Sequence, residues 1–177
     1  VADSVEWMFS KQILAPGGTL ELLTRLRDAG AVRFLGFSAH NEDAALRLLD
    51  AFPFDSVLFP VNWRAWFAGG VGPRLLDAAR TRGAAVLALK ALADRRRHEN
   101  EEARYGKAWY RPLDTYGDAE LALRFTLSRP GVTAVVSPGH EELLWWACDA
   151  ADAYAPLSPD EEAALADRAR REEAQTP

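Results

Sequence analysis

Residues 84–90 read AAVLALK, an almost entirely apolar run that stops on a lysine. Three further runs have the same form, namely VRFLGFS at 32–38, SVLFPVN at 56–62 and VTAVVS at 132–137. An amphipathic helical stretch follows each of them. Near-continuous hydrophobicity is typical of a parallel strand that is buried on both faces by helices. The sequence therefore predicts an α/β fold with parallel strands.

The polar residue that ends each run is a candidate for ligand binding, because parallel α/β folds place their ligands at the carboxyl ends of the strands. These residues are Ser38, Asn62, Lys90 and Ser137. Each also has a structural interpretation. Ser38 can satisfy a strand end, and Asn62 can close the turn that follows it. Lys90 can extend from the rim to solvent or, if it is desolvated, form a Schiff base.

Short signals mark where the helices begin. Asn41 is a favourable N-cap, Pro73 suits a first helical position, and Ser158 with Glu161 forms a capping box. The first helix is predicted near 19–29. Its apolar stripe, which we expect to be buried, consists of Leu20, Leu22, Leu23 and Leu26.

The order of these elements predicts a single partial domain. Residues 1–16 form a lead-in loop, 17–157 contain four strand–helix units, and 158–177 form a C-terminal helix and tail. Four such units are half of an eight-fold barrel, or alternatively an open doubly wound sheet. No glycine-rich dinucleotide fingerprint follows any strand, which favours the partial barrel.

Composition excludes several classes of function. A net charge of -5 disfavours nucleic-acid binding. No apolar run approaches the ~20 residues that a membrane span needs, and no signal peptide is visible. Cys148 is the single cysteine, which excludes an internal disulfide and indicates a cytoplasmic setting. His40, His98 and His140 lack metal-ligand spacing, so no metal site is expected.

The polar stretch at 94–115 is long for a connection inside a compact domain, and such connections are often functional. Between 94 and 111 it carries six Arg or Lys residues against four acidic residues, a net charge of +2. It is either a solvated loop or a contact for an anionic substrate.

Six segments, in order, resemble the aldo-keto reductase family. The first, LRDAGAVRFLGFSAHN at 26–41, is similar to the helix and fifth barrel strand of that family. The other five resemble its sixth and seventh strands, the helix before strand eight, the exit of strand eight and the C-terminal segment; they lie at 55–62, 83–93, 122–132, 135–139 and 157–162. The resemblance covers about residues 15–166 and implies the C-terminal half of a (β/α)8 TIM barrel.

The resemblance implies NAD(P)H-dependent reduction of a small-molecule carbonyl substrate. The family's catalytic Asp, Tyr, Lys and His lie on the first four strands, which this resemblance does not include, so we assign no catalytic residue. The chain alone is then expected to be inactive. The alternative is a non-catalytic nucleotide-binding or structural barrel module. A half-barrel leaves open strand edges, so we expect self-association or a partner chain that completes the barrel.

The cofactor half of the family site maps onto strand ends. Ser38 matches the serine that binds the nicotinamide amide, whereas Ala39 and Leu58 replace the usual Asn and Gln. Ser137 and Gly139 match the strand-eight exit, where helix N–H groups favour phosphate. Asn62 and Lys90 complete the implied cofactor-binding set. The sequence His-Glu-Glu at 140–142 stands where NADPH-selective members add Lys and Arg, which leaves the choice between NADP and NAD open.

Overall fold

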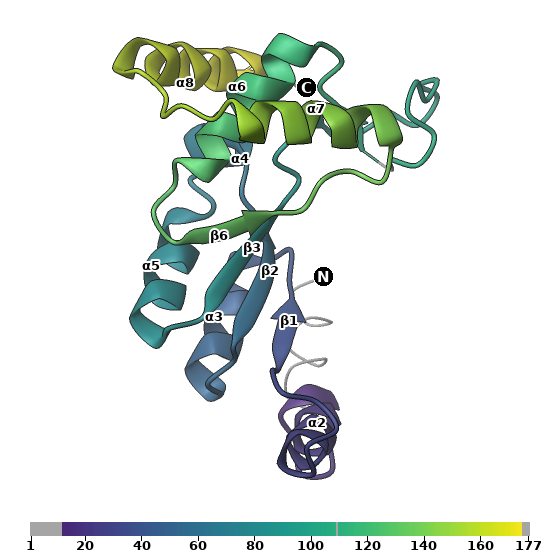
Figure 1. The fold of residues 1–177 in the computed structure, drawn as a ribbon, viewed down its shortest axis with the longest axis vertical. Helices are drawn as coiled ribbons and strands as arrows, with labels where there is room; N and C mark the ends of the chain where they lie inside the picture. Colours follow the sequence, from purple (N-terminus) through teal and green to yellow (C-terminus); the bar gives the residue numbers. More distant parts are fainter. Residues whose placement is uncertain (1–11, 109, 175–177) are drawn as a thin grey trace.

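The computed structural model describes residues 12–108 and 110–174, so most of the predicted lead-in and the last residues of the tail lie outside the described residues. Its elements follow one another along the chain as shown in Figure 1. They are α2 (Thr19–Asp28), β1 (Gly36–Ser38), α3 (Glu42–Ala51), β2 (Ser56–Pro60), α4 (Trp63–Phe67), α5 (Pro73–Arg82), β3 (Ala85–Leu89), β4 (Ala93–Arg95), β5 (Arg111–Pro112), α6 (Tyr116–Leu127), β6 (Val132–Val135), α7 (Glu141–Asp152) and α8 (Pro159–Ala174).

A four-stranded parallel sheet in the order β1-β2-β3-β6 confirms the predicted α/β class. The strands occur in chain order without a reversal, whereas a doubly wound sheet reverses its order at a switch point. The register pairs Leu58 of β2 with Leu87 of β3, so both side chains lie on the same face. The topology therefore favours a partial barrel over the doubly wound alternative.

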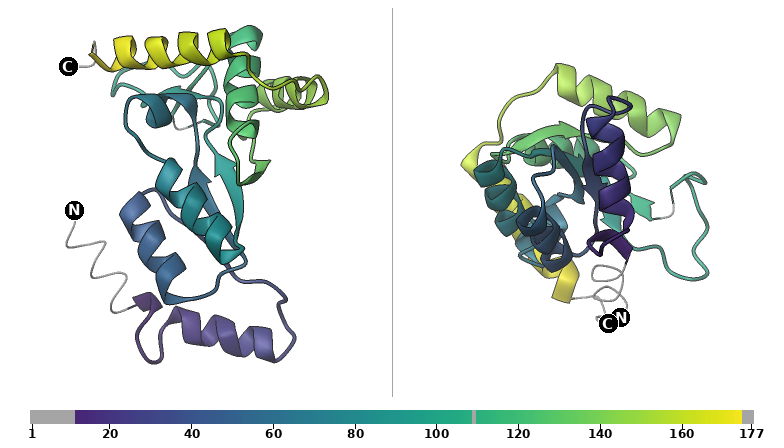
Figure 2. Two further views of the ribbon diagram at one scale, coloured as in Figure 1. Left: turned by 90° about the vertical axis from the view of Figure 1, so that its left-hand side faces the viewer. Right: turned by 90° about the horizontal axis from the view of Figure 1, so that it is seen from below.

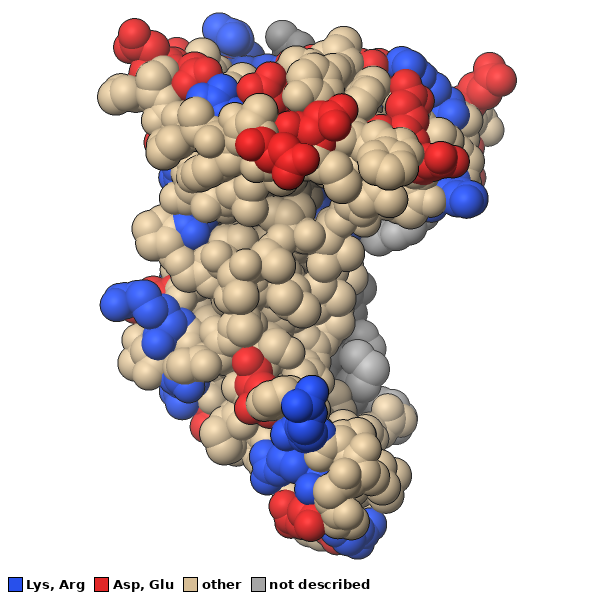
Figure 3. Space-filling view, in the orientation of Figure 1, with Lys and Arg blue, Asp and Glu red and all other residues tan. Residues whose placement is uncertain are grey.

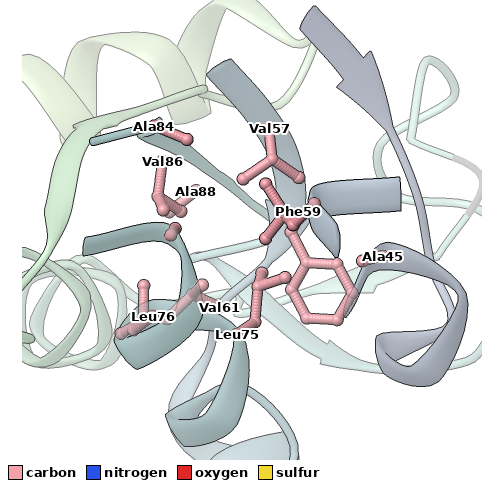
Figure 4. Packing of buried hydrophobic residues seen from close by; sticks show 11 residues of the cluster. Ala45, Val57, Phe59, Val61, Leu75, Leu76, Ala84, Val86 and Ala88 are labelled. Atoms are coloured by element: carbon pink, nitrogen blue, oxygen red, sulfur yellow. The ribbon is translucent and has the colours of Figure 1, made fainter. Parts of the chain in front are cut away.

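Among the described residues, helices cover one face of this sheet, whereas the sequence predicted that both faces are covered. Helices α3 and α5 lie side by side against that face (Figure 2). Phe59 of β2 points toward Leu75 of α5 and Ala45 of α3 (Figure 4), and all three are fully buried. The opposite face carries the half-buried Leu58 and Leu87. The surface over β2, β3 and β6 is almost free of charged side chains (Figure 3).

Helix α2 corrects a second expectation, since none of its residues is fully buried. Leu22 is 50% exposed and Leu26 is 38% exposed. The helix lies at one end of the molecule, beyond the short edge strand β1 (Figure 1), so only part of its surface has a neighbour. Leu20 and Leu23 are the residues of the predicted stripe that pack against a small core around Phe54.

The predicted helix starts are confirmed. The side chain of Asn41 accepts a hydrogen bond of 2.9 Å from the Ala44 N–H. Pro73 opens α5, and Ser158 and Glu161 exchange the two hydrogen bonds of a capping box. Helix α4 and the antiparallel pair β4–β5 were not predicted.

A second layer of helices lies across the carboxyl ends of the strands. Helix α6 packs on α7, and α8 packs on α4 (Figures 1 and 2). Trp63, Phe125 and Leu165 form a buried core between α4, α6 and α8. Across the described parts of the chain, every helix is too short or too polar to cross a bilayer. This layer frames the end of the sheet at which ligands are expected.

Candidate strand-end site

A cavity of about 260 Å³ lies at the carboxyl ends of the strands. Its lining comes from the residues after β1, β3 and β6 and from the connection between β4 and β5, here called the strap (residues 96–110). The lining residues are His40, Leu89, Lys90, Lys107, Ala108, Tyr110, Val136, Ser137, Pro138 and Gly139. Two lysines and no carboxylate stand among them, so this lining is electrostatically positive.

Lys90 holds an unusual backbone conformation at the end of β3. Its φ is 63°, and no other described non-glycine residue has a positive φ. The Ala93 N–H donates a 2.9 Å hydrogen bond to the Lys90 carbonyl and closes a tight turn there. A non-glycine residue in this region costs about 1–3 kcal/mol and persists only where the surroundings impose it, which is common at functional sites.

Burial and neighbouring positive charge together lower the pKa values of two groups in the cavity, Lys90 and His40. Burial, and secondarily the charge of Arg96, lowers the pKa of Lys90 below its ordinary value. Burial, and secondarily the charge of Lys90, lowers the pKa of His40. Both shifts favour the neutral form, so His40 is mainly uncharged at neutral pH.

The strap brings Lys107 and Tyr110 to the cavity because Arg97 folds it back on itself. The Arg97 guanidinium donates hydrogen bonds to the backbone carbonyls of Tyr105, Ala108 and Tyr110. Burial raises the pKa of Tyr110 to about 12, so its hydroxyl stays protonated across the physiological range. Tyr110 therefore offers an O–H donor in this cavity.

Glu101 fixes the start of the strap. Arg95 donates two hydrogen bonds to its carboxylate, at 2.7 and 3.0 Å, and the His98 N–H donates another at 3.1 Å. These donors, Arg95 first, lower the pKa of Glu101 to about 2. Arg111 lies 3.4 Å from the same carboxylate. Most described residues of the strap are exposed, as the solvated-loop interpretation expects, while Glu101 pairs with arginines and Lys107 lines the cavity.

Helix α7 begins directly after the β6 end of the cavity. Its N-cap, His140, makes no side-chain capping hydrogen bond. The first N–H groups of a helix have no partner within the helix and attract anions. Gly139 leaves open space around its Cα, so its backbone is accessible. Glu141 and Glu142 occupy the first turn, and their charges oppose an additional anion beyond that point.

The structure gathers three of the five predicted cofactor-binding residues around the cavity, namely Lys90, Ser137 and Gly139. Ser38 is exposed at the end of β1, outside this lining. Asn62 is 8% exposed and its side chain accepts a 2.9 Å hydrogen bond from the Ala65 N–H, which caps α4. The observed contact of Asn62 is thus the turn-closing one.

Lys107 and Tyr110 are site residues that were not selected from the sequence. The length and the net positive charge of the polar stretch at 94–115 pointed to this segment, but a loop that folds back over a site leaves no periodic pattern that selects single residues. Within the described residues, no three or more His, Cys, Asp or Glu side chains group as metal ligands would.

The fold can now be compared with known proteins. No protein-family model and no curated protein sequence matches the chain. The solved structures that resemble it include the holo form of the aldo-keto reductase AKR11C1 from Bacillus halodurans, with a TM-score of 0.56 and 19% identity over 86% of this chain and 53% of that one. The apo form gives a TM-score of 0.57 and 18% identity over 90% of this chain and 59% of that one.

A third similar structure is the thermostable aldo-keto reductase Tm1743 in complex with the inhibitor epalrestat. Its TM-score is 0.55, at 16% identity over 84% of this chain and 53% of that one. The chain therefore spans little more than half the length of the structures it resembles. At such identities the similarity establishes the fold: a four-stranded parallel α/β unit that matches part of an aldo-keto reductase barrel.

Proposed function

We propose that this chain is the C-terminal half of an aldo-keto-reductase-like oxidoreductase and carries its nicotinamide-nucleotide site, for NADP or NAD. The observation that supports this most directly is the positive cavity at the strand ends, where Lys90 and Lys107 face the accessible backbone of Gly139. A phosphate group needs clustered cations and free N–H donors, and this cavity offers both. We propose a cytoplasmic location, because a chain with a single cysteine, Cys148, fits a reducing compartment.

The size of the cavity limits what it can hold. Its 260 Å³ lies below the ~300–1,000 Å³ of pockets that enclose a drug-sized ligand. We infer that it accommodates a phosphate-bearing part of the nucleotide. The remainder would lie along the open strand ends toward Ser38, which matches the family residue for the nicotinamide amide.

A bound nicotinamide nucleotide supplies a hydride for reduction of an aldehyde or ketone. This chain's own residues hold the anionic part: Lys90 and Lys107 by charge, and the backbone after β6 by N–H donation. The proton donor that the family uses belongs to barrel strands outside the resemblance, and general acid catalysis contributes ~10²–10⁴-fold. We therefore propose that the chain alone binds the nucleotide without measurable turnover.

Isothermal titration calorimetry with NADPH, NADH and ADP tests the binding. We expect saturable binding that weakens as salt concentration rises, because it depends on charge. Lys107→Ala is expected to weaken binding ~5–10-fold. The charge-matched control is Arg80→Ala, an exposed residue on α5 that pairs with Asp77 and lies outside the cavity lining. Absence of binding, or equal effects of both variants, would refute this site.

The second candidate is a non-catalytic nucleotide-binding or structural module. Ala39 and Leu58 favour it, because they replace the two side chains that would clamp a reactive nicotinamide in the related family. ADP and NADPH distinguish the two candidates. Equal affinity for both would show that the nicotinamide contributes nothing and would support the module.

We also propose that the open face of the sheet is covered by a second copy or by a partner chain that completes the barrel. Both outer strands of the described sheet, β1 and β6, have one unpaired edge, and such edges accept further strands.

A further inference from the structure

We propose that Lys90 is a carbonyl-capturing amine, whose Nζ forms an imine with an aldehyde or ketone bound in the strand-end cavity. This activity goes beyond nucleotide binding and needs no cofactor. It assigns to Lys90 a covalent role, for which carbonyl compounds with an anionic group are the fitting class because the lining is positive.

Position 90 carries a lysine in a chain whose cations are mostly arginines. The chain contains 18 arginines and three lysines, namely Lys11, Lys90 and Lys107. Arginine cannot lose its proton in a protein, whereas lysine can be converted to a neutral, nucleophilic amine by its surroundings. Two of the three lysines line this cavity. Most cations of this chain are arginines, whereas the cations of this cavity are lysines, which can supply a neutral amine.

The geometry around Lys90 suits a nucleophile. Its side chain is half-buried, and its backbone is held at a φ of 63° by the turn that ends β3. Leu89, Val136 and Pro138 supply apolar surface beside it. Such surroundings raise the fraction of neutral amine, which is how Schiff-base lysines are activated, while the ammonium form remains the one that attracts an anion. The lowered pKa of Lys90 agrees with this arrangement.

The charged and titratable groups that face Lys90 come from two parts of the fold. His40 follows β1, and Arg96, Lys107 and Tyr110 belong to the strap. The positive charge of Arg96 opposes protonation of the amine. His40 is mainly neutral at neutral pH because its own pKa is lowered. Tyr110 remains a neutral phenol.

The proposed step is balanced without an oxidant or reductant. The lone pair of the neutral Lys90 Nζ attacks the carbonyl carbon, and the C=O π electrons move to oxygen. The nitrogen then releases a proton and the oxygen takes one, which gives a carbinolamine. The nitrogen lone pair then expels the hydroxyl, which takes up a proton and leaves as water, to give an iminium ion. Release of the remaining N–H proton gives the neutral imine. Tyr110 lines the same cavity, and the proposal assigns its hydroxyl as the hydrogen-bond donor to the reacting oxygen.

Reductive trapping on the intact chain tests the proposal. The protein is incubated with glyoxylate and sodium cyanoborohydride near pH 7, and peptide mass mapping follows the modification of each lysine over time. We expect Lys90 to be modified faster than Lys107, because burial lowers the pKa of Lys90 and so raises its neutral, reactive fraction. The rate at Lys90 should also level off at a lower pH in the folded protein than in denaturant, because the fold lowers its pKa.

Three controls make the result specific. In denaturant the two lysines should react at equal rates, since the fold then no longer distinguishes them. Lys90→Arg should remove the modified peptide at position 90 and leave the rate at Lys107 unchanged. Tyr110→Phe should slow the modification of Lys90 alone. Modification of Lys90 at or below the rate of Lys107 in the folded protein overturns the proposal.

Failure of this proposal is separable from failure of nucleotide binding. Trapping is measured without nucleotide, and calorimetry is measured without aldehyde. Protection of Lys90 by NADPH would show in addition that both ligands use the same cavity.

Discussion

The two faces of the parallel sheet have similar apolar sequences and different surroundings. On the face toward α3 and α5, Val57, Phe59 and Val86 are fully buried. On the opposite face, Leu58 and Leu87 are only half-buried. A continuous apolar run is therefore sufficient to form a strand, but it does not show that both of its faces are covered within the same chain. The difference is what a part of a barrel should show, because its inner face packs only when the other strands are present.

The largest expected difference between the faces lies in side-chain truncation. Phe59→Ala should lower the free energy of unfolding by about 3–5 kcal/mol, because it leaves a cavity between β2, α3 and α5. Leu58→Ala, at the neighbouring position of the same strand, should cost about 1 kcal/mol because that side chain is half-buried. Urea unfolding of both variants measures the contrast. Similar losses would mean that the open face is packed after all.

A buried carboxylate, that of Glu42, joins the two helices that cover the sheet and gives a second test of this face. Glu42 of α3 is 8% exposed and accepts a 2.8 Å hydrogen bond from the Gly72 N–H at the start of α5. Arg74 lies 2.8 Å from the same carboxylate. Glu42→Ala should cost about 2–3 kcal/mol because it leaves a buried N–H donor without an acceptor.

Glu42→Gln serves as the matched variant, since it keeps an acceptor oxygen and loses only the charge. It should recover part of that loss in thermal unfolding. If the two variants unfold at the same temperature, the contribution of Glu42 is purely electrostatic.

Much of this fold could be predicted from local sequence. The four strands, the Asn41 cap, the Pro73 start and the capping box at Ser158 depend on signals within a few residues. Lys90 was also predicted as a strand-end residue. The exposure of Leu22 and Leu26 could not be predicted, because an apolar stripe indicates a buried face without showing whether a neighbour exists.

The strap could not be placed from the sequence for a related reason. Lys107 and Tyr110 reach the cavity because Arg97 binds backbone carbonyls, and any residue can supply a carbonyl. Such a contact leaves no pattern in the residue types. Asn62 shows the reverse case, because its residue type allows both a ligand and a helix-capping interpretation, and the structure shows the capping contact with Ala65.

Acid pH tests the helix layer across the strand ends, where an ion pair between α6 and α8 adds to the apolar packing. Arg124 of α6 pairs with Glu161 of α8 at 2.9 Å, and this contact, more than the Ser158 N–H, lowers the pKa of Glu161 to about 2. The folded pKa lies below the unfolded value of ~4.3. The stabilising contribution is therefore complete above that value and is lost as the pH falls toward 2.

We expect amide hydrogen exchange in α8 to speed up between about pH 4.5 and 2, before exchange in β2 and β3 does. Glu161→Gln should weaken α8 already at neutral pH and flatten this pH dependence. Asp160→Asn, on the same turn of α8, is the control. An unchanged profile in Glu161→Gln would assign the acid sensitivity to other groups.

The smallest effect on stability, and the most direct test of the open face, comes from Leu87→Thr. Threonine keeps a high strand propensity, so the free energy of unfolding of the isolated chain should change by less than ~1 kcal/mol. Association should respond more strongly, because Leu87 lies beside Leu58 on the face proposed to meet a second copy or a partner chain. Sedimentation equilibrium of the wild type should show concentration-dependent self-association, which the variant weakens. Leu22→Thr, at an exposed leucine of α2, should leave it unchanged. A wild type that stays monomeric at every concentration would exclude the second copy as the occupant of this face.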